Sequence, residues 1–383
     1  MSVTAPKGFR ASAVAADIKP SGKPDVALVV NDGPLYAAAG VFTTNRFPAA
    51  PVLWTRQVVA GGRISAVVTN AGNANALTGK PGFADTHATA EHAAVMLAHS
   101  AGEIAVLSTG IIGVPLPMPQ LLAGVEAAAA SLSPDGGAAA ANAIRTTDTV
   151  AKQSHVAGPG WSVGGMAKGA GMLAPALATM LVVLTTDAVA DAADLDRALR
   201  EASRTTFDRL DSDGCMSTND TVLLLASGAS GLTPSYESLA FAVQTACADL
   251  AAQLIADAEG ASKEIGITVR TAASEVEAVI AGRTISRSNL LKCALHGEDP
   301  NWGRVLAALG TTDVAFESDQ VDVAINGVTV CRAGGVGDDR TLVQMKDRHI
   351  HIVVDLHAGD AEATIWTNDL TADYVHENSA YTT

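Results

Sequence analysis

The sequence predicts a layered α/β (α+β) protein in which sheets lie between helices, arranged as two intimately packed lobes. The chain has 383 residues, which is long for one ordinary hydrophobic core. Hydrophobic residues make up 48% and charged residues 17%, a balance typical of a folded protein. Strand-like and helix-like segments alternate along the chain without the regular period of a βαβ array, which favours mixed layers.

Each expected element has its own pattern. Short apolar or alternating runs predict strands, and apolar residues spaced three and four apart predict helices. In the first half we expect strands at residues 25–30, 65–70 and 104–107, and helices at 87–100, 117–132 and 137–144. In the second half we expect helices at 191–205 and 235–258, and strands at 177–184, 321–325, 328–330 and 349–356. Asn326 and Gly327 favour a type I′ turn between two of these strands.

Charge and targeting signals exclude several classes of protein. The formal net charge is -15, whereas nucleic acids and anionic membranes are bound through basic patches. We find neither an apolar signal segment at the N-terminus nor an apolar run of roughly 18 residues. The cysteines lack C-x-x-C spacing, which fits a reducing compartment and argues against zinc: Cys215, Cys247, Cys293 and Cys331. We therefore expect a cytoplasmic protein without nucleic-acid or membrane partners.

The most informative segment is residues 161–187, WSVGGMAKGAGMLAPALATMLVVLTTD. Its glycines around Lys168 predict a loop that leads through Pro175 into an apolar strand carrying Thr179. A Thr in such a strand usually serves packing. The glycines do not match the phosphate-binding pattern G-x-x-x-x-G-K-[ST]. Local physics alone therefore predicts only a loop of special geometry before a buried strand.

Residues 166–181, MAKGAGMLAPALATML, resemble the cleavage segment of the glutamate/ornithine N-acetyltransferase family. Further blocks resemble the same family in the same order: NAGNAN at 70–75, STG at 108–110, TTDT at 146–149, DGCMSTNDT at 213–221, AEGASK at 258–263, DPNWGR at 299–304 and the tail at 378–383. The blocks span nearly the whole chain, so the ordered set is specific. Two positions depart from the family pattern. Residues 258–263 read AEGASK where GEGATK is commoner, and Cys215 stands where a small or acidic residue is usual. Both bear on how the substrate is bound and not on the mechanism.

The resemblance implies a chain that cuts itself between Ala178 and Thr179. It implies a fold similar to N-terminal-nucleophile proteins, an α chain of residues 1–178, a β chain of residues 179–383, and a heterotetramer of two of each. Thr179 then becomes the nucleophile. A Thr hydroxyl needs a nearby base, and the released α-amine, with an ordinary pKa of roughly 7.7–8.0, can be that base. No metal and no organic cofactor is implied.

The family also implies roles for further residues. An acyl transfer needs donors aimed at the developing oxyanion, and the resemblance assigns Thr109 and Gly110 to that hole. Without the family, the STG sequence is simply a turn signal. The implied substrate-binding residues are Thr146 or Thr147, Lys168, Thr179, Glu259, Asn378 and Thr383. We prefer Thr146 to Thr147 because neighbouring strand residues point to opposite faces. Lys168 suits the substrate α-carboxylate and Glu259 suits an ammonium, although such residues are commonly solvent-exposed.

The implied reaction is a ping-pong acetyl transfer from N-acetylornithine to glutamate through an acetyl-Thr179 ester. It yields ornithine and N-acetylglutamate for arginine biosynthesis, and acetyl-CoA as a second donor stays open. One alternative is an autoprocessed aminopeptidase or amidohydrolase of similar architecture, whose nucleophile is usually Ser. Another is a non-catalytic amino-acid-binding protein, which would keep an intact chain.

Two groups of potential metal ligands do not support a metal site. The acidic residues Asp211 and Asp213 lack the D-x-[DN]-x-[DN]-G spacing of a calcium loop. A second row on the last strand is expected on a solvated face, with the intervening apolar residues inward: His349, His351, Asp355 and His357. His155 is expected in a loop without a partner.

Overall fold

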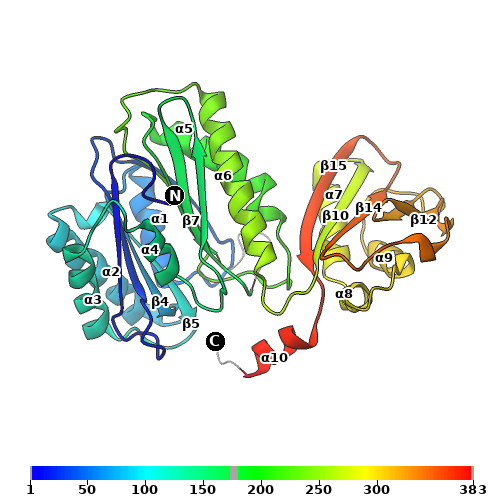
Figure 1. Ribbon diagram of the computed structural model, residues 1–383, viewed down its shortest axis with the longest axis horizontal. Helices are drawn as coiled ribbons and strands as arrows, with labels where there is room; N and C mark the ends of the chain where they lie inside the picture. Colours follow the sequence, from blue (N-terminus) through cyan, green and yellow to red (C-terminus); the bar gives the residue numbers. More distant parts are fainter. Residues whose placement is uncertain (1, 173–179, 381–383) are drawn as a thin grey trace.

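The structure is a computed structural model that describes residues 2–172 and 180–380 and shows two lobes (Figure 1). The first lobe contains two sheets and the second contains one. The expected layered α/β architecture with two lobes is confirmed.

The first sheet has the strand order β1-β2-β4-β5. Its strands are β1 (Phe9–Val14), β2 (Val26–Asn31), β4 (Ala66–Asn73) and β5 (Ile104–Ile111). The last two strands run parallel, and the short helix η1 (Ala101–Glu103) leads into β5. The alternate residues Leu28, Val68 and Val106 pack against α2 (Gly79–Leu97) and α3 (Met118–Ala130), which cover the outer face. These strands are long and apolar enough to be buried on both faces.

The second sheet has the order β3-β9-β8-β7-β6. Its strands are β3 (Ala37–Phe42), β6 (Lys152–Ala157), β7 (Ser162–Lys168), β8 (Leu181–Thr186) and β9 (Thr221–Ala226). The helices α5 (Ala192–Thr205) and α6 (Tyr236–Ala256) cover its outer face. Between the two sheets, apolar side chains of both meet those of α1 (Ala50–Ala60) and α4 (Gly137–Ala143). The result is a succession of helix and sheet layers (Figure 1).

The second lobe is built on a six-stranded sheet with the order β13-β12-β11-β14-β10-β15. Its strands are β10 (Glu264–Ala272), β11 (Asp322–Ile325), β12 (Val328–Arg332), β13 (Gly335–Val336), β14 (His349–Asp355) and β15 (Ala361–Asn368). The helices α7 (Glu275–Ser286), α8 (Asn289–His296) and α9 (Trp302–Leu309), with the short η3 (Arg340–Leu342), complete it. Asn326 and Gly327 have φ of 46° and 84°, which confirms the expected hairpin turn.

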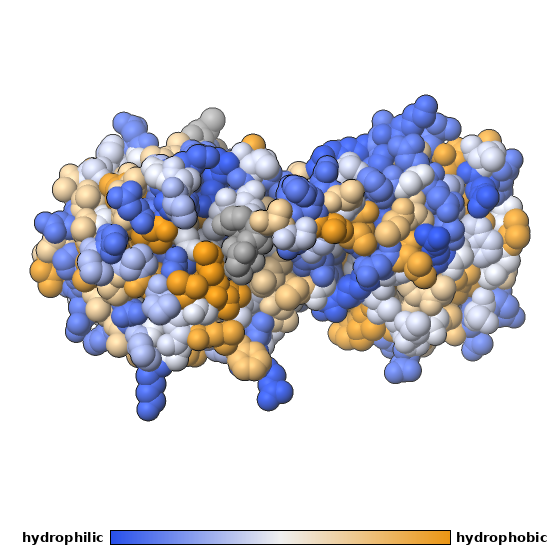
Figure 2. All heavy atoms as spheres, turned by 90° about the horizontal axis from the view of Figure 1, so that it is seen from below, coloured by the Kyte–Doolittle hydropathy of each residue, from blue (hydrophilic) through white to orange (hydrophobic). Residues whose placement is uncertain are grey.

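A narrow junction joins the lobes, whereas intimate packing of the two was expected (Figure 2). Asp211, which follows η2 (Phe207–Arg209), donates its backbone N–H to the carbonyl of Trp366 on β15 at 2.8 Å. The buried Lys292 of α8 donates to the carbonyl oxygens of Ser212, at 2.6 Å, and of Asn368. The last described element is α10 (Ala372–Ala380), which lies beneath the junction in Figure 1. This helix returns to the first lobe, where Asn378 contacts Glu259.

Several local expectations are wrong. Part of the expected Gly-rich loop is the buried strand β7, which pairs with β6 and β8. A Cβ on Gly164 would lie 2.3 Å from the carbonyl oxygen of Ser2, so that glycine allows close packing instead of a turn. His155 lies in β6. The STG block is not a turn, because β5 continues through Thr109 and Gly110. The parallel ladder with β4 extends to these residues, which local sequence does not reveal.

The helix α6 is long and apolar enough to span a membrane by length and composition, with a mean hydropathy of 1.5. This corrects the expectation that no such segment exists. Half of that window is buried inside the fold. Leu239, Val243 and Leu250 of this helix belong to the core beside the second sheet. Its hydropathy therefore reflects a core helix packed on a sheet.

Candidate active site

A pocket lies where the ends of β5 and β7 meet the segment after α4, the segment before β9, the residues after α6, and α10. It encloses a cavity of about 90 Å³. Its walls combine small apolar groups with hydroxyl, amide, ammonium and carboxylate groups: Ala74, Thr109, Gly110, Ile112, Thr146, Thr147, Lys168, Gly171, Met172, Ser217, Thr218, Asn219, Glu259 and Asn378. A small cavity with a few convergent polar groups is suited to a small polar substrate.

The end of β5 presents Thr109 and Gly110 to the pocket. Their backbone is fixed because they pair with Ala71 and Gly72 of the parallel strand β4. Gly110 has φ of 124°, and a Cβ there would lie 2.2 Å from the carbonyl oxygen of Gly72. Only glycine fits that position.

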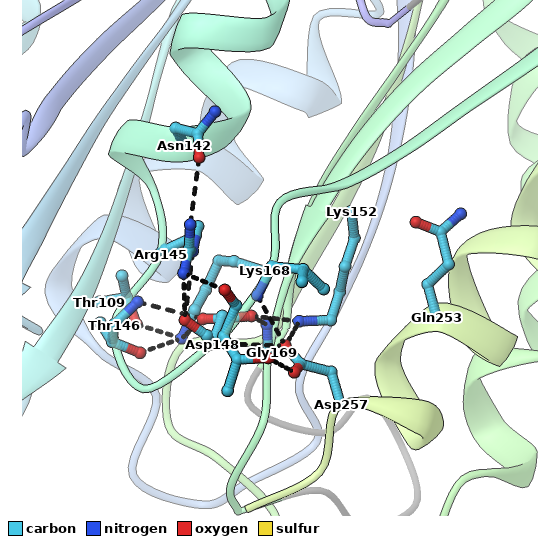
Figure 3. A network of polar contacts seen from close by, with 12 residues as sticks. Thr109, Asn142, Arg145, Thr146, Asp148, Lys152, Lys168, Gly169, Gln253 and Asp257 are labelled. Carbon is cyan, nitrogen blue, oxygen red and sulfur yellow. Dashed lines mark hydrogen bonds and ion pairs between the residues drawn. The ribbon is translucent and has the colours of Figure 1, made fainter.

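Lys168, at the end of β7, is the central cation of the pocket (Figure 3). Its ammonium donates to Oγ1 of Thr146 at 2.7 Å and to Oγ1 of Thr109 at 3.2 Å. The side chain is fully buried, and burial lowers the pKa of Lys168 while the carboxylate of Asp148 opposes that shift. The alternative of an exposed loop lysine is therefore wrong for this residue.

Lys168 belongs to a buried network of charged side chains (Figure 3). Asp148 lies 2.7 Å from the ammonium of Lys152 and 3.9 Å from that of Lys168, and it accepts the backbone N–H of Gly169 at 2.6 Å. Burial by itself would raise the pKa of Asp148, but the two lysines and the backbone donor lower it to about 2. Lys152 also pairs with Asp257 at 2.6 Å. The carboxylates thus hold both lysines inside the protein.

Thr146 and Thr147 both line the pocket, in bends after α4 and not in a strand. The expectation that they point to opposite faces of a strand is therefore wrong, because a bend can turn both side chains the same way. Of the two, only Thr146 accepts a hydrogen bond from the Lys168 ammonium in the contacts that the structure describes.

Glu259 and Asn378 meet at the pocket although 119 positions separate them. The amide of Asn378 on α10 donates to Oε2 of Glu259 at 3.1 Å. A Cβ on Gly171 would lie 2.4 Å from the same carboxylate oxygen, so this glycine lets Glu259 approach the backbone. Ala178, Thr179 and Thr383 lie outside the described residues, and their assigned roles stay predictions.

Three pocket residues and the acidic neighbour of one of them had no role assigned from the sequence, where two of them were weighed only as part of a discounted calcium loop: Ser217, Thr218, Asn219 and Asp220. Asn219 donates to the carbonyl oxygens of Ala74 at 2.7 Å and Ser108 at 2.8 Å, so it ties together the ends of β4 and β5. The sequence did point to this segment, because all four residues belong to the recognised block at 213–221. Long-range contacts place them there, because β9, which follows them, pairs in parallel with β8.

No group of three or more His, Cys, Asp or Glu side chains suited to a metal ion occurs among residues 2–172 and 180–380. On β14 the inward residues are Ile350, Ile352 and Val354, while His349 and His351 are exposed, as expected. The expectation is wrong for Asp355, which is buried and accepts hydrogen bonds from the side chains of Arg270 and Thr271. The cysteines are free thiols, of which Cys215 and Cys293 are exposed.

Comparison with known proteins identifies relatives over the full chain. The model of the ArgJ family matches residues 10–383. The chain is 69% identical over 381 residues to the arginine biosynthesis bifunctional protein ArgJ of Streptomyces coelicolor, and 61% identical over 383 residues to that of Thermobifida fusca, with 100% of each chain covered. A solved structure of ornithine acetyltransferase complexed with ornithine, from Mycobacterium tuberculosis, is 52% identical; the match covers 47% of this chain and 96% of that chain, with a TM-score of 0.43.

The recognised blocks span the chain, and the family match covers the same length. The full-length relatives carry the name of an arginine-biosynthesis enzyme, which agrees with the activity that the blocks imply. The chain therefore belongs to the ArgJ family, and its expected identity as an arginine-biosynthesis acetyltransferase is confirmed.

Proposed function

We propose that this enzyme moves an acetyl group from N-acetylornithine to glutamate through an ester on Thr179, after self-cleavage between Ala178 and Thr179. The observation that carries the proposal is the convergence on one pocket of Thr109, Gly110, Thr146, Lys168 and the Glu259–Asn378 pair. These residues come from distant parts of the chain, and the roles implied for them require that they meet.

The hydrogen bonds around Lys168 support an oxyanion hole at Thr109 and Gly110. An ammonium has donors and no acceptor, so the contact at 3.2 Å occupies a lone pair of Thr109 Oγ1. The Thr109 hydroxyl proton remains available for another acceptor. In the proposed reaction that acceptor is the oxyanion of the tetrahedral intermediate, with the backbone N–H of Gly110 as second donor. The buried positive charge of Lys168 strengthens the Thr109 hydroxyl as a donor.

Charge at the pocket fits amino-acid substrates. Lys168 offers a cation for a carboxylate, and Glu259 offers an anion for an ammonium. Ornithine and glutamate both carry these groups at their α-carbon. The amide of Asn378 holds Glu259 in place from the C-terminal helix, so the tail contributes to the substrate end of the pocket. We include Thr147, Thr383 and Thr179 itself among the proposed substrate contacts.

The sheet topology explains how a cut chain would stay assembled. The proposed fragments are residues 1–178 and 179–383. Lys168 of β7 pairs in register with Leu181 of β8, so the cut would fall between two hydrogen-bonded neighbours. The order β3-β9-β8-β7-β6 places two strands of the second fragment between strands of the first. Separation would break two ladders and expose a core, which supports lasting association of the fragments. We extend this to a heterotetramer of two α and two β chains in the cytoplasm.

The relatives are named bifunctional, which extends the proposal to acetyl-CoA as a second acetyl donor to glutamate. No metal or organic cofactor takes part in the proposed exchange. The first half of the cycle breaks the acetyl C–N bond of N-acetylornithine and forms the ester at Thr179, and the second half breaks that ester and forms the acetyl C–N bond of N-acetylglutamate, with the released α-amine passing the proton.

The test combines mass spectrometry with an exchange assay. Purified protein is incubated with N-acetylornithine alone, quenched in acid, and weighed under denaturing conditions. We expect two fragments, with an added acetyl group only on residues 179–383. Glutamate should then remove that acetyl group and yield N-acetylglutamate. An aminopeptidase would instead release the acyl group to water, and a binding protein would remain one chain of 38.8 kDa without acetylation.

A further inference from the structure

Asp257 is a carboxyl group at the C-terminal end of α6, where the partial negative charge of the helix end disfavours an anion. Its side chain is 8% exposed and lies 2.6 Å from the ammonium of the fully buried Lys152. The carboxylate also accepts the backbone N–H of Thr149 at 3.0 Å and the hydroxyl of the same residue. These partners are 105 and 108 positions away in the sequence. Asp257 therefore fastens the end of α6 to a distant segment, at a place where a carboxylate is otherwise unfavourable.

Lys152 links Asp257 to a second buried carboxylate, that of Asp148. Lys152 lies on the edge strand β6, and its ammonium donates to Asp148 at 2.7 Å and to Asp257 at 2.6 Å. Asp148 in turn accepts the backbone N–H groups of Thr146 at 3.1 Å and of Gly169 at 2.6 Å. One buried ammonium thus ties together the end of α6, the segment before β6 and the residue that follows β7.

The segments tied in this way carry both charged contacts of the active-site pocket. Glu259 follows two residues after Asp257, and its backbone N–H donates to the carbonyl oxygen of Ala170 at 2.9 Å. Lys168 is the last residue of β7. Asp257 is not among the described residues that line the pocket. It can therefore influence a bound substrate only through the side chains that it holds in place.

We propose that Asp257 is a positioning residue for the two charged substrate contacts, Glu259 and Lys168. It acts through Lys152 and Thr149, and it keeps the two contacts at the separation that the amino-acid substrates require. The inference rests on the proposed function, in which these contacts bind an ammonium and a carboxylate of the substrate. Glu259 and Lys168 carry opposite charges and attract each other. A fixed framework keeps them from pairing with each other and leaves both available to the substrate.

The test is steady-state kinetics of acetyl transfer by Asp257→Asn. Asparagine keeps the shape and an acceptor for the Thr149 N–H but loses the charge that pairs with Lys152, while Lys152 retains Asp148. We expect KM for N-acetylornithine and for glutamate to rise about tenfold to a hundredfold, because small displacements of binding groups have effects of this size. The value of kcat should change by less than about threefold, since the lost binding is common to ground state and transition state.

The matched control is Asp355→Asn at the end of β14 in the second lobe. The Asp355 side chain is also 8% exposed, and it too accepts hydrogen bonds from a cation, Arg270, and from a threonine hydroxyl, that of Thr271. The control therefore removes a carboxylate of the same burial and the same kinds of partner, away from the pocket. Its KM values should remain those of wild type.

The fraction of molecules that become acetylated separates positioning from mere support of the fold. Each variant is saturated with N-acetylornithine, and the acetylated fraction is measured by mass spectrometry. Positioning predicts a wild-type fraction with a raised KM. A reduced fraction with wild-type KM values would mean that Asp257 only stabilises the protein, and would overturn the proposal.

If Asp257→Asn does not fold, Thr149→Val takes its place. This variant removes the hydroxyl bound to Asp257 and keeps the pair between Asp257 and Lys152. KM should then rise about threefold to tenfold, the equivalent of one hydrogen bond, and an unchanged KM would also overturn the proposal. Failure of wild-type protein to transfer acetyl groups would instead refute the proposed function.

Discussion

Replacement of Thr109 by Val tests the proposed oxyanion hole directly. Valine has nearly the shape of threonine, so the end of β5 and its pairing with β4 should persist. The change removes the hydroxyl that accepts the Lys168 ammonium at 3.2 Å and lines the pocket. Lys168 keeps its shorter bond to Thr146 at 2.7 Å and the nearby carboxylate of Asp148, so the ammonium is not left unpaired.

Two effects of different size follow from this geometry. The lost hydrogen bond to a charged donor should lower the free energy of unfolding by about 1.5–3 kcal/mol. Loss of one oxyanion donor raises the barrier by about 2.7–4 kcal/mol, or roughly a hundred- to a thousandfold in kcat. The donor acts mainly on the transition state, so kcat should fall far more than the affinity for N-acetylornithine.

The assay is steady-state kinetics of acetyl transfer on protein that is already cut, with urea unfolding measured in parallel. Thr109→Ser is the matched control, because it keeps the hydroxyl and should retain most of the activity. If kcat of Thr109→Val stays within about threefold of wild type, far short of the ~2.7 kcal/mol effect, then Thr109 is not an oxyanion donor. We make no claim about self-cleavage in this variant, since that step can use other donors.

Further outcomes are expected at other positions. On a denaturing gel the protein should run as chains of 178 and 205 residues (383 − 178 = 205); Thr179→Ala should stay intact and inactive while Thr179→Ser still cuts, and cutting of the Ala variant at the same bond would indicate an external protease. Asp148→Asn should lower the free energy of unfolding by about 3–5 kcal/mol at neutral pH, because it leaves buried lysine charge uncompensated. The pKa of Asp148 is depressed to about 2, so its stabilisation is present above its ordinary pKa and lost as pH falls from about 4 towards 2; acid titration of stability should show this loss in wild type and not in the variant. Asn219→Ala should reduce kcat more than it raises KM, because two strand-end carbonyls lose their donor; equal activity would refute its positioning role. Gly110→Ala should fail to form an active site, since its Cβ would lie 2.2 Å from the carbonyl oxygen of Gly72, and normal kinetics would contradict that clash.

Elements with strong local patterns were predictable. The apolar run at 25–30 corresponds to β2, and the helix expected at 191–205 corresponds to α5, whose first residue follows the capping Asp191. The Asn326-Gly327 turn formed as expected because the dihedral preference of those residues is local. By contrast, β7 was predicted as a loop. Its glycines are weak strand formers, and only its two neighbouring strands and close packing against Ser2 make them extended.

Part of the candidate site was predictable for a different reason. The family blocks named the residues that now line one pocket, including Lys168, Thr109 and Glu259, although nothing local to each residue predicts that they meet. For Lys168 the general rule that lysines are seldom buried favoured an exposed side chain. The structure shows that this side chain is buried. Its burial depends on Asp148, which shares its charge with Lys152 across the sheet edge.

The sequence by itself determined the class of fold, the family and the chemistry to be expected at Thr179, because these follow from short-range patterns and from ordered blocks. Only the tertiary structure decided that Asn219 ties the end of β5 to that of β4, and that Asp220 binds the backbone beside the proposed nucleophile. It also decided that the proposed fragments share one sheet. These contacts join residues that lie 40 to 145 positions apart. The physical reason is that burial and strand pairing satisfy hydrogen bonds between distant segments, and no local preference of the chain encodes which segments will meet.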